Sequence, residues 1–195
     1  HGWLVLEGGK MSKSKGNVVD PVVHIERYGL DPIRYFLLRE VPFGSDGVFS
    51  NEALINRINS DLANDLGNLL SRTVTMIEKY FKGVLPSAVA PAPIDDDLKE
   101  LAIDTRRKVE ESMDALEISN ALVAIWELIG RANKYIDETT PWILAKDPSQ
   151  QDRLGTVLYN LAETLRIISV LISPFMTKTP TKIREQLGLA EVDKF

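Results

Sequence analysis

Three lysines surround two serines near the start of the chain, in the stretch KMSKSK at residues 10–15. An apolar run at residues 1–6, which predicts a buried strand, and a Gly8-Gly9 pair precede this stretch, and Gly16 follows it. Glycines on both sides let a loop move and let its backbone approach a ligand closely. Ammonium groups, hydroxyls and free amides in such a loop suit a nucleoside triphosphate, whose phosphate charge they would stabilise in a transition state. A solvated basic turn is the alternative, but the word KMSKS directly after a strand favours the phosphate-binding loop.

A second candidate site is a polar strip on the long helix that the sequence pattern predicts after Ser50. At 100° per residue, the apolar positions of this helix define one face, and polar side chains lie within about 40° of a line opposite it. These side chains are Asn64, Asn68, Arg72, Thr75 and Lys79, with Asp61 nearby. A solvated helix face is the default interpretation of such a strip. Amide and guanidinium donors can also read the Watson–Crick edge of an unstacked base, where cytosine offers the N3 and O2 acceptors.

Trp142 is the third candidate, in the segment TTPWIL on a short turn that Pro141 begins. A tryptophan in such a segment is more often a packing residue. An exposed indole would instead be a stacking platform for a base, worth about 1–3 kcal/mol. The residues alone leave both interpretations open.

The elements that must position these residues fall into two regions. In residues 1–49 the sequence predicts a strand, the lysine-serine loop and two short helices, whose starts are marked by Asp20-Pro21 and Asp31-Pro32. A loop rich in glycine, serine and aspartate then occupies residues 42–50. From residue 50 to residue 195, four or five amphipathic helices joined by short loops predict a bundle. The expected fold is mainly α: a helical bundle preceded by the end of an α/β nucleotide-binding fold.

Composition narrows the possible functions. The chain has 195 residues, no cysteine and two histidines, which argues against a disulfide framework, a thiolate zinc site and a histidine-rich metal site. Its net charge of -5 argues against a generic nucleic-acid binder, so any RNA contact must come from a local patch. There is no unbroken apolar run long enough to cross a bilayer, and no signal peptide pattern at the start.

The stretch KMSKS, followed by KGNVVDP and YGLDPIRYFLL, resembles the second signature sequence of class I aminoacyl-tRNA synthetases and the segment that joins their catalytic fold to a helical anticodon-binding domain. The resemblance implies that Lys13 is the main catalytic lysine and Lys10 an assisting one. It implies an ATP-binding loop made of Lys10, Met11, Ser12, Lys13 and Ser14. ATP and Mg²⁺ are the implied cofactors of the whole enzyme, with no metal site in this segment.

The helical part is similar to the anticodon-domain segments of bacterial methionyl-tRNA synthetases, through NRINSDLANDLGNLLSR at residues 56–72 and ANKYIDETTPWILAK at residues 132–146. This likeness implies a ligase for methionine and tRNA(Met), located in the cytoplasm. It also implies that Asn68, Arg72 and Trp142 bind the CAU anticodon, with Trp142 stacked on its first base. Lys79 matches a further basic position on the same face.

Several expectations remain for the structure to test. The partner signature of the class, a His-Ile-Gly-His motif, does not occur in the sequence, so we expect a segment of a larger ligase that is inactive alone. The alternatives are a stand-alone tRNA-binding module without catalysis, a related isoleucyl, leucyl, valyl or cysteinyl enzyme, or a plain interaction bundle. We expect Trp3 and Trp126 to be core residues, Asp31 to be a helix N-cap and Arg34 to lie on a helix surface.

Overall fold

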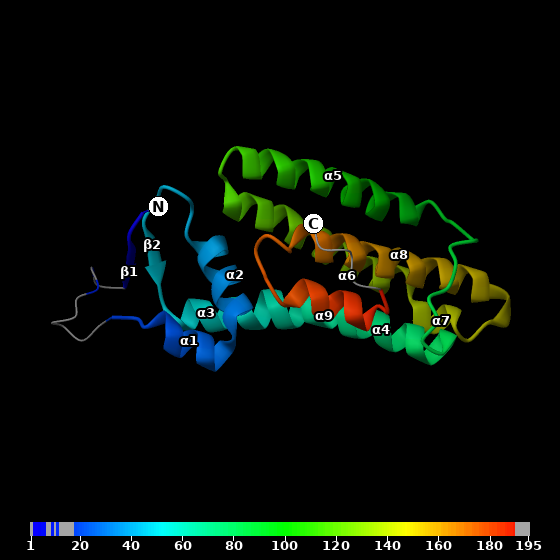
Figure 1. The fold of residues 1–195 in the computed structure, drawn as a ribbon. Helices are drawn as coiled ribbons and strands as arrows, with labels where there is room; N and C mark the ends of the chain where they lie inside the picture. Colours follow the sequence, from blue (N-terminus) through cyan, green and yellow to red (C-terminus); the bar gives the residue numbers. More distant parts are fainter. Residues whose placement is uncertain (1, 7–8, 10, 12–17, 190–195) are drawn as a thin grey trace.

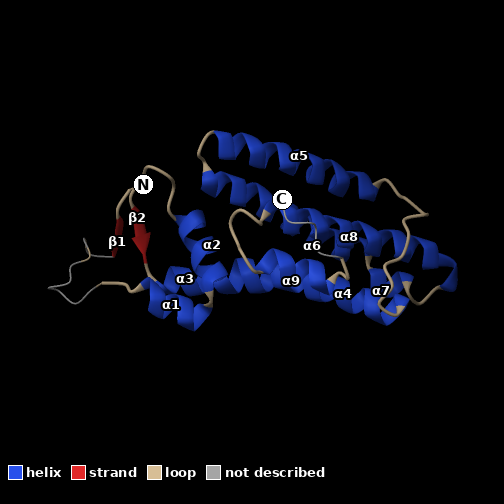
Figure 2. Ribbon diagram, in the orientation of Figure 1, coloured by secondary structure: helices blue, strands red, loops and turns tan. Residues whose placement is uncertain are grey.

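The structure, a computed structural model, describes residues 2–6, 9, 11 and 18–189. Helices make up most of it, and a pair of short strands lies at one end (Figures 1 and 2). The prediction of a mainly helical bundle that follows the end of an α/β fold is confirmed. Lys10, Ser12, Lys13 and Ser14 lie outside the described residues.

The strand pair consists of β1 (Leu4–Leu6) and β2 (Gly47–Phe49), which run parallel with Leu4 opposite Gly47 and Leu6 opposite Phe49. The sequence prediction of a loop throughout residues 42–50 is therefore wrong for β2. Three residues are too few to show the alternation that identifies a strand. Glycine is required at position 47, because a Cβ there would lie 2.5 Å from a methyl group of Val41.

Two helices, α1 and α2, connect these strands along the chain. α1 (Pro21–Tyr28) begins as predicted, with the Asp20 carboxylate accepting from the Val22 N–H, and it ends at Gly29, whose φ is +91°. α2 (Leu30–Glu40) joins two hydrophobic cores, since Ile33 and Phe36 pack in the small core under the strands while Tyr35 lies in the bundle core. α2 therefore fixes the strand pair relative to the bundle.

Asp31 is not the N-cap that the sequence predicts, because α2 already begins at Leu30. Its buried carboxylate accepts hydrogen bonds of 2.6–3.0 Å from the backbone and hydroxyl groups of Thr177 and Thr179 and from the Lys178 N–H. Burial alone would raise the pKa of Asp31, but these hydrogen bonds lower it to about 2. Arg34 is likewise not a plain surface residue, because its guanidinium donates to the Phe175 and Pro174 carbonyls at 2.8 and 3.1 Å. Both residues tie α2 to the loop before the last helix.

The long helix predicted after Ser50 is present but not regular. It comprises α3 (Asn51–Arg57), the π-helix η2 (Ile58–Gly67) and α4 (Asn68–Phe81) without interruption. Wider i→i+5 turns of this kind often occur at functional sites. Two carbonyls of η2 are satisfied from the neighbouring helix α6 (Ile118–Thr139): Trp126 Nε1 donates to Asp61 O at 3.2 Å, and Asn133 Nδ2 donates to Asp65 O at 3.1 Å.

The rest of the bundle packs around one large core. Its elements are α5 (Ile94–Asp114), α6, the four-residue helix α7 (Pro141–Leu144), the 3₁₀ turn η3 (Pro148–Gln150), α8 (Gln151–Leu171) and α9 (Thr179–Gln186). α5 and α6 lie side by side, and α5 is on the opposite side of the bundle from α4 (Figure 1). Leucine and isoleucine side chains from α6 and α8 fill the centre.

One segment of the described residues, Pro148–Leu171, is long and apolar enough to cross a membrane by length and composition alone. However, 67% of its most apolar stretch is buried in the bundle. This is the position of a core helix, whose apolar side chains are already covered by its neighbours.

The prediction that both other tryptophans are core residues holds for Trp126 and not for Trp3. Trp126 packs against the bundle core and its ring centroid lies 4.4 Å from that of Tyr35, as expected for a packing residue. The prediction that Trp3 is a core residue is wrong, because 69% of Trp3 is exposed. Trp3 comes just before a strand that pairs with one neighbour among the described residues, so the described residues leave its side chain largely uncovered.

Candidate nucleic-acid interface

The structure brings Arg72 and Trp142 together on the surface. The guanidinium carbon of Arg72, on α4, lies 5.9 Å from the centroid of the Trp142 ring, on α7. Trp142 is 39% exposed, so one part of its indole packs and the other part is accessible to a ligand. A partly exposed indole beside a guanidinium offers a base both a stacking surface and hydrogen-bond donors.

A sharp turn between α6 and α7 places Trp142. α6 ends at Thr139, and Thr140 adopts the left-handed conformation with a φ of +43° while its N–H still donates to Ile136 O at 3.0 Å. Pro141 then starts α7 with the φ that a first helical residue needs. The chain therefore leaves the axis of α6 at Thr140, and α7 carries Trp142 next to Arg72 of α4.

A buried polar network fixes the end of α6 that leads to this turn. The hydroxyl of Tyr135 donates to Asp95 at 2.6 Å, and Arg153 pairs with both carboxylate oxygens of Asp95 at 2.6 and 2.7 Å. Burial would raise the pKa of Asp95, but the hydrogen bonds from Arg153, Tyr135 and the Ala92 N–H lower it to about 2. Because the ion pair is bidentate and largely buried, α5, α6 and α8 are held in register behind the Trp142 turn.

The Arg72 side chain is oriented by an acidic neighbour that the sequence analysis did not select. Arg72 Nη2 lies 2.8 Å from Oδ1 of Asp137, on the last turns of α6. The side chains of Arg72 and Asp137 are 29% and 65% exposed, so this ion pair orients Arg72 without contributing much to stability. Asp137 lies five residues before Trp142, within the same sequence segment. Its partner lies 65 positions away, so the tertiary structure alone identifies the pair.

Asn68 and Lys79 extend the site along α4. Asn68 is exposed and lies one turn before Arg72, so the two side chains project in similar directions. Lys79 is exposed two turns after Arg72, and its Nζ lies 5.3 Å from the centroid of the Tyr80 ring. At 1.5 Å per residue, Lys79 is roughly 10 Å from Arg72 along the helix axis. Arg72 is thus the residue of α4 that contacts Trp142, Asn68 flanks it one turn away on the same face, and Lys79 lies further along; Asn68, Arg72 and Trp142 are called the cluster below.

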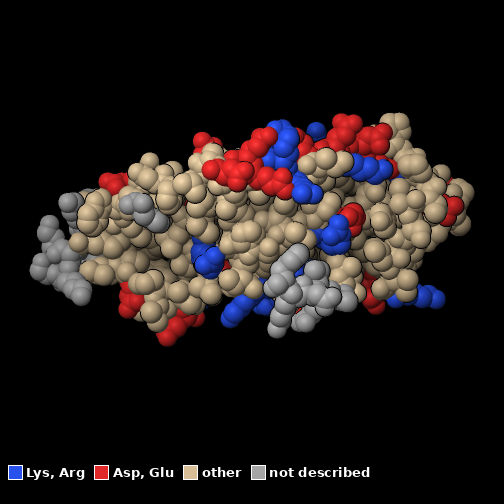
Figure 3. All heavy atoms as spheres, turned by 45° about the horizontal axis from the view of Figure 1, so that its top comes forward, with Lys and Arg blue, Asp and Glu red and all other residues tan. Residues whose placement is uncertain are grey.

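The distribution of charge separates this cluster from the acidic side of the molecule. α5 carries eight aspartates and glutamates against four lysines and arginines, which accounts for most of the net charge of -5. Figure 3 shows acidic side chains gathered along this helix. A polyanion is repelled from that side, so the charge favours approach to α4 and α7.

The lysine-serine loop can be described only at its borders. Leu6 and Gly9 exchange two backbone hydrogen bonds of 3.0 and 3.1 Å, and Met11 packs against the small core. After the loop, the His24 ring lies 2.9 Å from Asp20 O and 3.0 Å from Asn51 Oδ1, so it joins the start of α1 to the start of α3. The borders of the loop are therefore tied to the strand pair and to the long helix.

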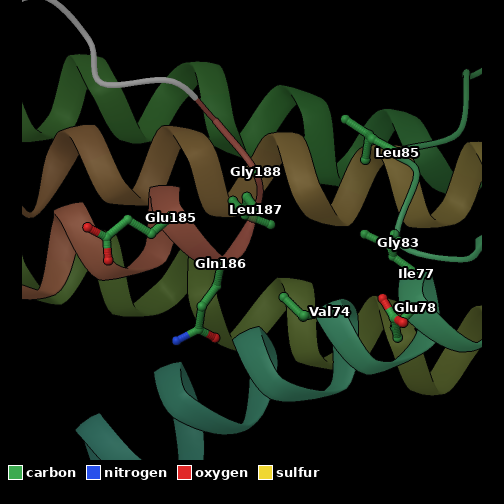
Figure 4. A pocket seen from close by; sticks show the side chains of 9 residues that line it. All are labelled: Val74, Ile77, Glu78, Gly83, Leu85, Glu185, Gln186, Leu187 and Gly188. Carbon is green, nitrogen blue, oxygen red and sulfur yellow. The ribbon is translucent and has the colours of Figure 1, made fainter.

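Two cavities lie away from these candidate residues. One of about 180 Å³ lies between the end of α4 and α9, with Glu78 and Glu185 among its lining residues (Figure 4). A shallower one of about 570 Å³ lies between α5 and α8 and includes Ile103 and Val170. Neither includes Asn68, Arg72, Lys79 or Trp142, and the described residues contain no group of three His, Cys, Asp or Glu side chains suited to a metal ion. Asn68 is exposed and Trp142 is 39% exposed, so the cluster lies on the surface.

Two protein-family models match the chain. Residues 1–74 match the family model described as tRNA synthetases class I (M), in agreement with the resemblance of the KMSKS region. Residues 85–194 match the model described as the anticodon binding domain of methionyl tRNA ligase, which is more than half of the chain. The chain belongs to the family of methionyl tRNA ligases that carry this anticodon binding domain.

Individual relatives agree with this assignment. The chain is 73% identical to the methionine–tRNA ligase of Caldanaerobacter subterraneus subsp. tengcongensis, over 98% of this chain and 30% of the ligase. It is 60% identical to the methionine–tRNA ligase of Bacillus subtilis, over 98% of this chain and 29% of that protein. The structure of Mycobacterium tuberculosis methionyl-tRNA synthetase in complex with methionyl-adenylate superposes with a TM-score of 0.94 at 46% identity, covering 98% of this chain and 38% of the other. The chain thus spans about 30% of the length of the curated relatives.

Proposed function

We propose that this chain supplies the anticodon-reading surface and the ATP loop of a methionine–tRNA ligase, which activates methionine with ATP and transfers it to tRNA(Met). The observation that carries the first part is the placement of Arg72, held by Asp137, beside the partly exposed ring of Trp142. The second part rests on the KMSKS stretch and on the matching family model. The methionyl-adenylate named for the superposed structure supports ATP and methionine as substrates.

On the anticodon side, the first base unstacks and lies on the exposed part of the Trp142 ring. Arg72 then directs its N–H groups at the N3 and O2 acceptors of cytosine, and Asn68 adds an amide from the preceding turn. Lys79 lies further along α4, where it meets phosphate charge rather than a base edge. Stacking accepts any base, so discrimination between bases comes from the Arg72 and Asn68 donors.

On the ATP side, Lys13 and Lys10 stabilise the charge that develops on the phosphates, and the hydroxyls of Ser12 and Ser14 add hydrogen bonds. The methionine carboxylate attacks the α-phosphorus of ATP and takes its adenylyl group, and pyrophosphate leaves; Mg²⁺ would neutralise charge on the phosphates. The described residues that border the loop are held by the Leu6–Gly9 turn and by His24. None of these steps requires a metal ligand from the described residues.

We further propose that residues 1–49 form the end of the catalytic fold and residues 50–195 the anticodon-binding domain, and that the ligase acts in the cytoplasm. The long helix connects the two regions: it begins at Asn51, beside the strands, and it carries Asn68 and Arg72 in the bundle.

A binding experiment with the chain itself tests the anticodon part. An RNA stem-loop with a CAU anticodon is titrated at fixed salt, and intrinsic fluorescence is compared between the original chain and Trp142→Phe, which retains Trp3 and Trp126. Quenching by the CAU loop that depends on Trp142, with weaker binding when the first base is changed, is the expected result. Equal affinity for all loops, or quenching that survives in Trp142→Phe, contradicts the proposal.

A further inference from the structure

Two adjoining cavities form an apolar groove between α5 and α8. They measure about 570 Å³ and 280 Å³, and Ala102, Ile103 and Ile167 line both of them. Along this groove, Ile103 is 75% exposed and Val170 is 48% exposed. Uncovered isoleucine and valine side chains on two neighbouring helices make an apolar surface of the kind that another segment covers.

The charged side chains beside the groove are already paired. Arg106 donates to Glu110 on α5 at 2.8 Å, and Arg166 pairs with Glu163 on α8 at 2.6 Å. Each of these pairs lies within one helix, so neither joins α5 to α8 across the groove. An apolar surface between paired charges accepts an apolar segment more readily than a free ion.

The last described residue lies beside this groove. Leu189 lines a small cavity together with Tyr159, Glu163 and Arg166 of α8. The same three residues of α8 also line the groove, Tyr159 and Glu163 in its smaller cavity and Arg166 in its larger one. The chain after Leu189 therefore continues from the side of α8 that borders the groove.

The segment that follows, residues 190–195, has a suitable length and suitable side chains to fill the groove. Its sequence is AEVDKF, in which Val192 and Phe195 are the large apolar residues. Six residues reach up to roughly 20 Å, and α8 from Tyr159 to Val170 is roughly 16 Å long. The family model for the anticodon binding domain matches residues 85–194, so it includes most of this segment.

We propose that residues 190–195 pack into the α5–α8 groove, with Val192 and Phe195 covering Ile103 and Val170. The segment has two acidic residues and one lysine, whereas three cations and two carboxylates line the two cavities, so the charges are complementary. The segment is attached beside the groove, so its effective concentration there is high and it needs less affinity than a separate partner would.

The packed segment would join α5 to α8 on the surface of the bundle. The buried ion pair of Asp95 with Arg153 already joins the starts of these two helices. The segment adds a second connection further along them, where the groove lies. The inference is independent of the proposed function, because it involves neither RNA nor ATP.

The sequence contains no cysteine, so a pair of introduced cysteines reports one contact only. In the full chain with Ile103→Cys and Phe195→Cys, oxidation by glutathione should form a disulfide within one molecule, detected by mass and by mobility on a non-reducing gel. Asp97→Cys with Phe195→Cys is the matched control, because Asp97 is an exposed residue of α5 that lies 3.8 Å from Arg131 of α6. The Ile103 pair should form its disulfide about tenfold faster than the control pair or more.

A stability measurement on the full chain tests the same contact without a crosslink. Val192→Ser combined with Phe195→Ser should lower the midpoint of thermal unfolding by roughly 2–4 °C, because the apolar contacts in the groove are lost. Lys194→Ser, in the same segment, is the control and should leave the midpoint unchanged.

Three results would overturn the inference. The first is an equal rate of disulfide formation in the two cysteine pairs. The second is an unchanged thermal midpoint in the double serine variant. The third is the formation of disulfide-linked dimers by the single variant Ile103→Cys faster than by Asp97→Cys, which would show that a second copy of the chain covers the groove instead.

Discussion

Arg72 gives the sharpest test of base reading, because its partner in the free protein is known. In Arg72→Ala the ion pair with Asp137 disappears together with the donors that face the Trp142 ring. The pair is exposed on the Asp137 side, so its contribution to stability is roughly 0.2–1 kcal/mol. A base-edge contact from arginine contributes about 1–3 kcal/mol to binding. The variant should therefore lose fivefold to 150-fold in affinity for the CAU stem-loop while its free energy of unfolding changes by about 1 kcal/mol at most.

The variant Asp137→Asn separates the ion pair of Arg72 with Asp137 from the proposed contact of Arg72 with a base. In the free chain, Asp137 competes with the base for the guanidinium, so only the surplus of the base contact appears in the affinity. The loss caused by Arg72→Ala should therefore be larger in an Asp137→Asn background, by about the 0.2–1 kcal/mol of the ion pair. A double-mutant cycle of stem-loop affinities and urea unfolding, all at one salt concentration, measures both quantities.

The choice of stem-loops decides the interpretation. One carries CAU and the other carries uracil in place of the first cytosine. Arg72→Ala should reduce the affinity ratio between the two loops, because the donors that distinguish cytosine are lost. If both loops lose affinity by the same factor, Arg72 contacts a phosphate and the base-reading role is refuted.

Three further predictions concern stacking, catalysis and folding. Trp142→Ala should weaken CAU stem-loop binding by about 1–3 kcal/mol, and Trp142→Phe by less, because a smaller ring still stacks. The catalytic test uses a chimera in which this chain replaces the matching segment of the Caldanaerobacter ligase. In that chimera, Lys13→Ala should raise the activation barrier of methionine-dependent ATP–pyrophosphate exchange by about 2–4 kcal/mol and change methionine binding little. Asp31→Asn should lower the free energy of unfolding by about 1–3 kcal/mol at pH 7, measured by urea unfolding. Because the pKa of Asp31 is lowered to about 2 from 3.8 by its hydrogen bonds, this stabilisation is complete above about pH 4 and is lost towards pH 2, so the difference between Asp31→Asn and the original chain should shrink over that range.

Each of these has a result that contradicts it. Equal binding by Trp142→Phe and Trp142→Ala would show that stacking is not the contribution of the ring. Normal exchange turnover in the Lys13→Ala chimera would remove the catalytic role. For Asp31, Asp96→Asn on the exposed side of α5 is the matched control. A constant difference between Asp31→Asn and the original chain from pH 7 to pH 2 would contradict the assigned carboxylate role.

Helix periodicity predicts which side chains share the outer face of α4, whereas TTPWIL alone leaves Trp142 open between packing and stacking, and only the family resemblance selects it. Periodicity does not predict the partners of these side chains on other helices. Asp137 and Asn133 contact the long helix through the register between α6 and that helix, which no local pattern encodes. The π-helix adds to this difficulty, because residues 58–67 do not advance by 100° each. Positions within it, such as Asn64, therefore cannot be placed relative to Arg72 by α-helical counting.

Asp31 shows a different limit of sequence interpretation. An aspartate before a proline is typical of an N-cap, and at Asp20 that interpretation holds. At Asp31 the preceding glycine already ends one helix and begins the next, so the carboxylate is left to find donors elsewhere. It finds them 146 to 148 positions away in the loop before α9. The same local pattern thus gives a local role in one place and a long-range role in the other.

The geometry of the long helix limits how the two candidate sites can act on each other. Asn51, at its start, bonds to His24 near the end of the lysine-serine loop, and Arg72 lies 21 residues later, roughly 30 Å away along the axis. Within the protein, the long helix is one connection between the Trp142 surface and the border of that loop. α2 lies in both hydrophobic cores, and Asp31 and Arg34 fasten it to the loop before α9. The strand pair and the bundle are therefore joined twice, once by the long helix and once by α2, and a hinge at either connection is opposed by the other. Such a doubly connected frame keeps the strand pair, which borders the lysine-serine loop, at a fixed separation from the surface formed by Arg72 and Trp142.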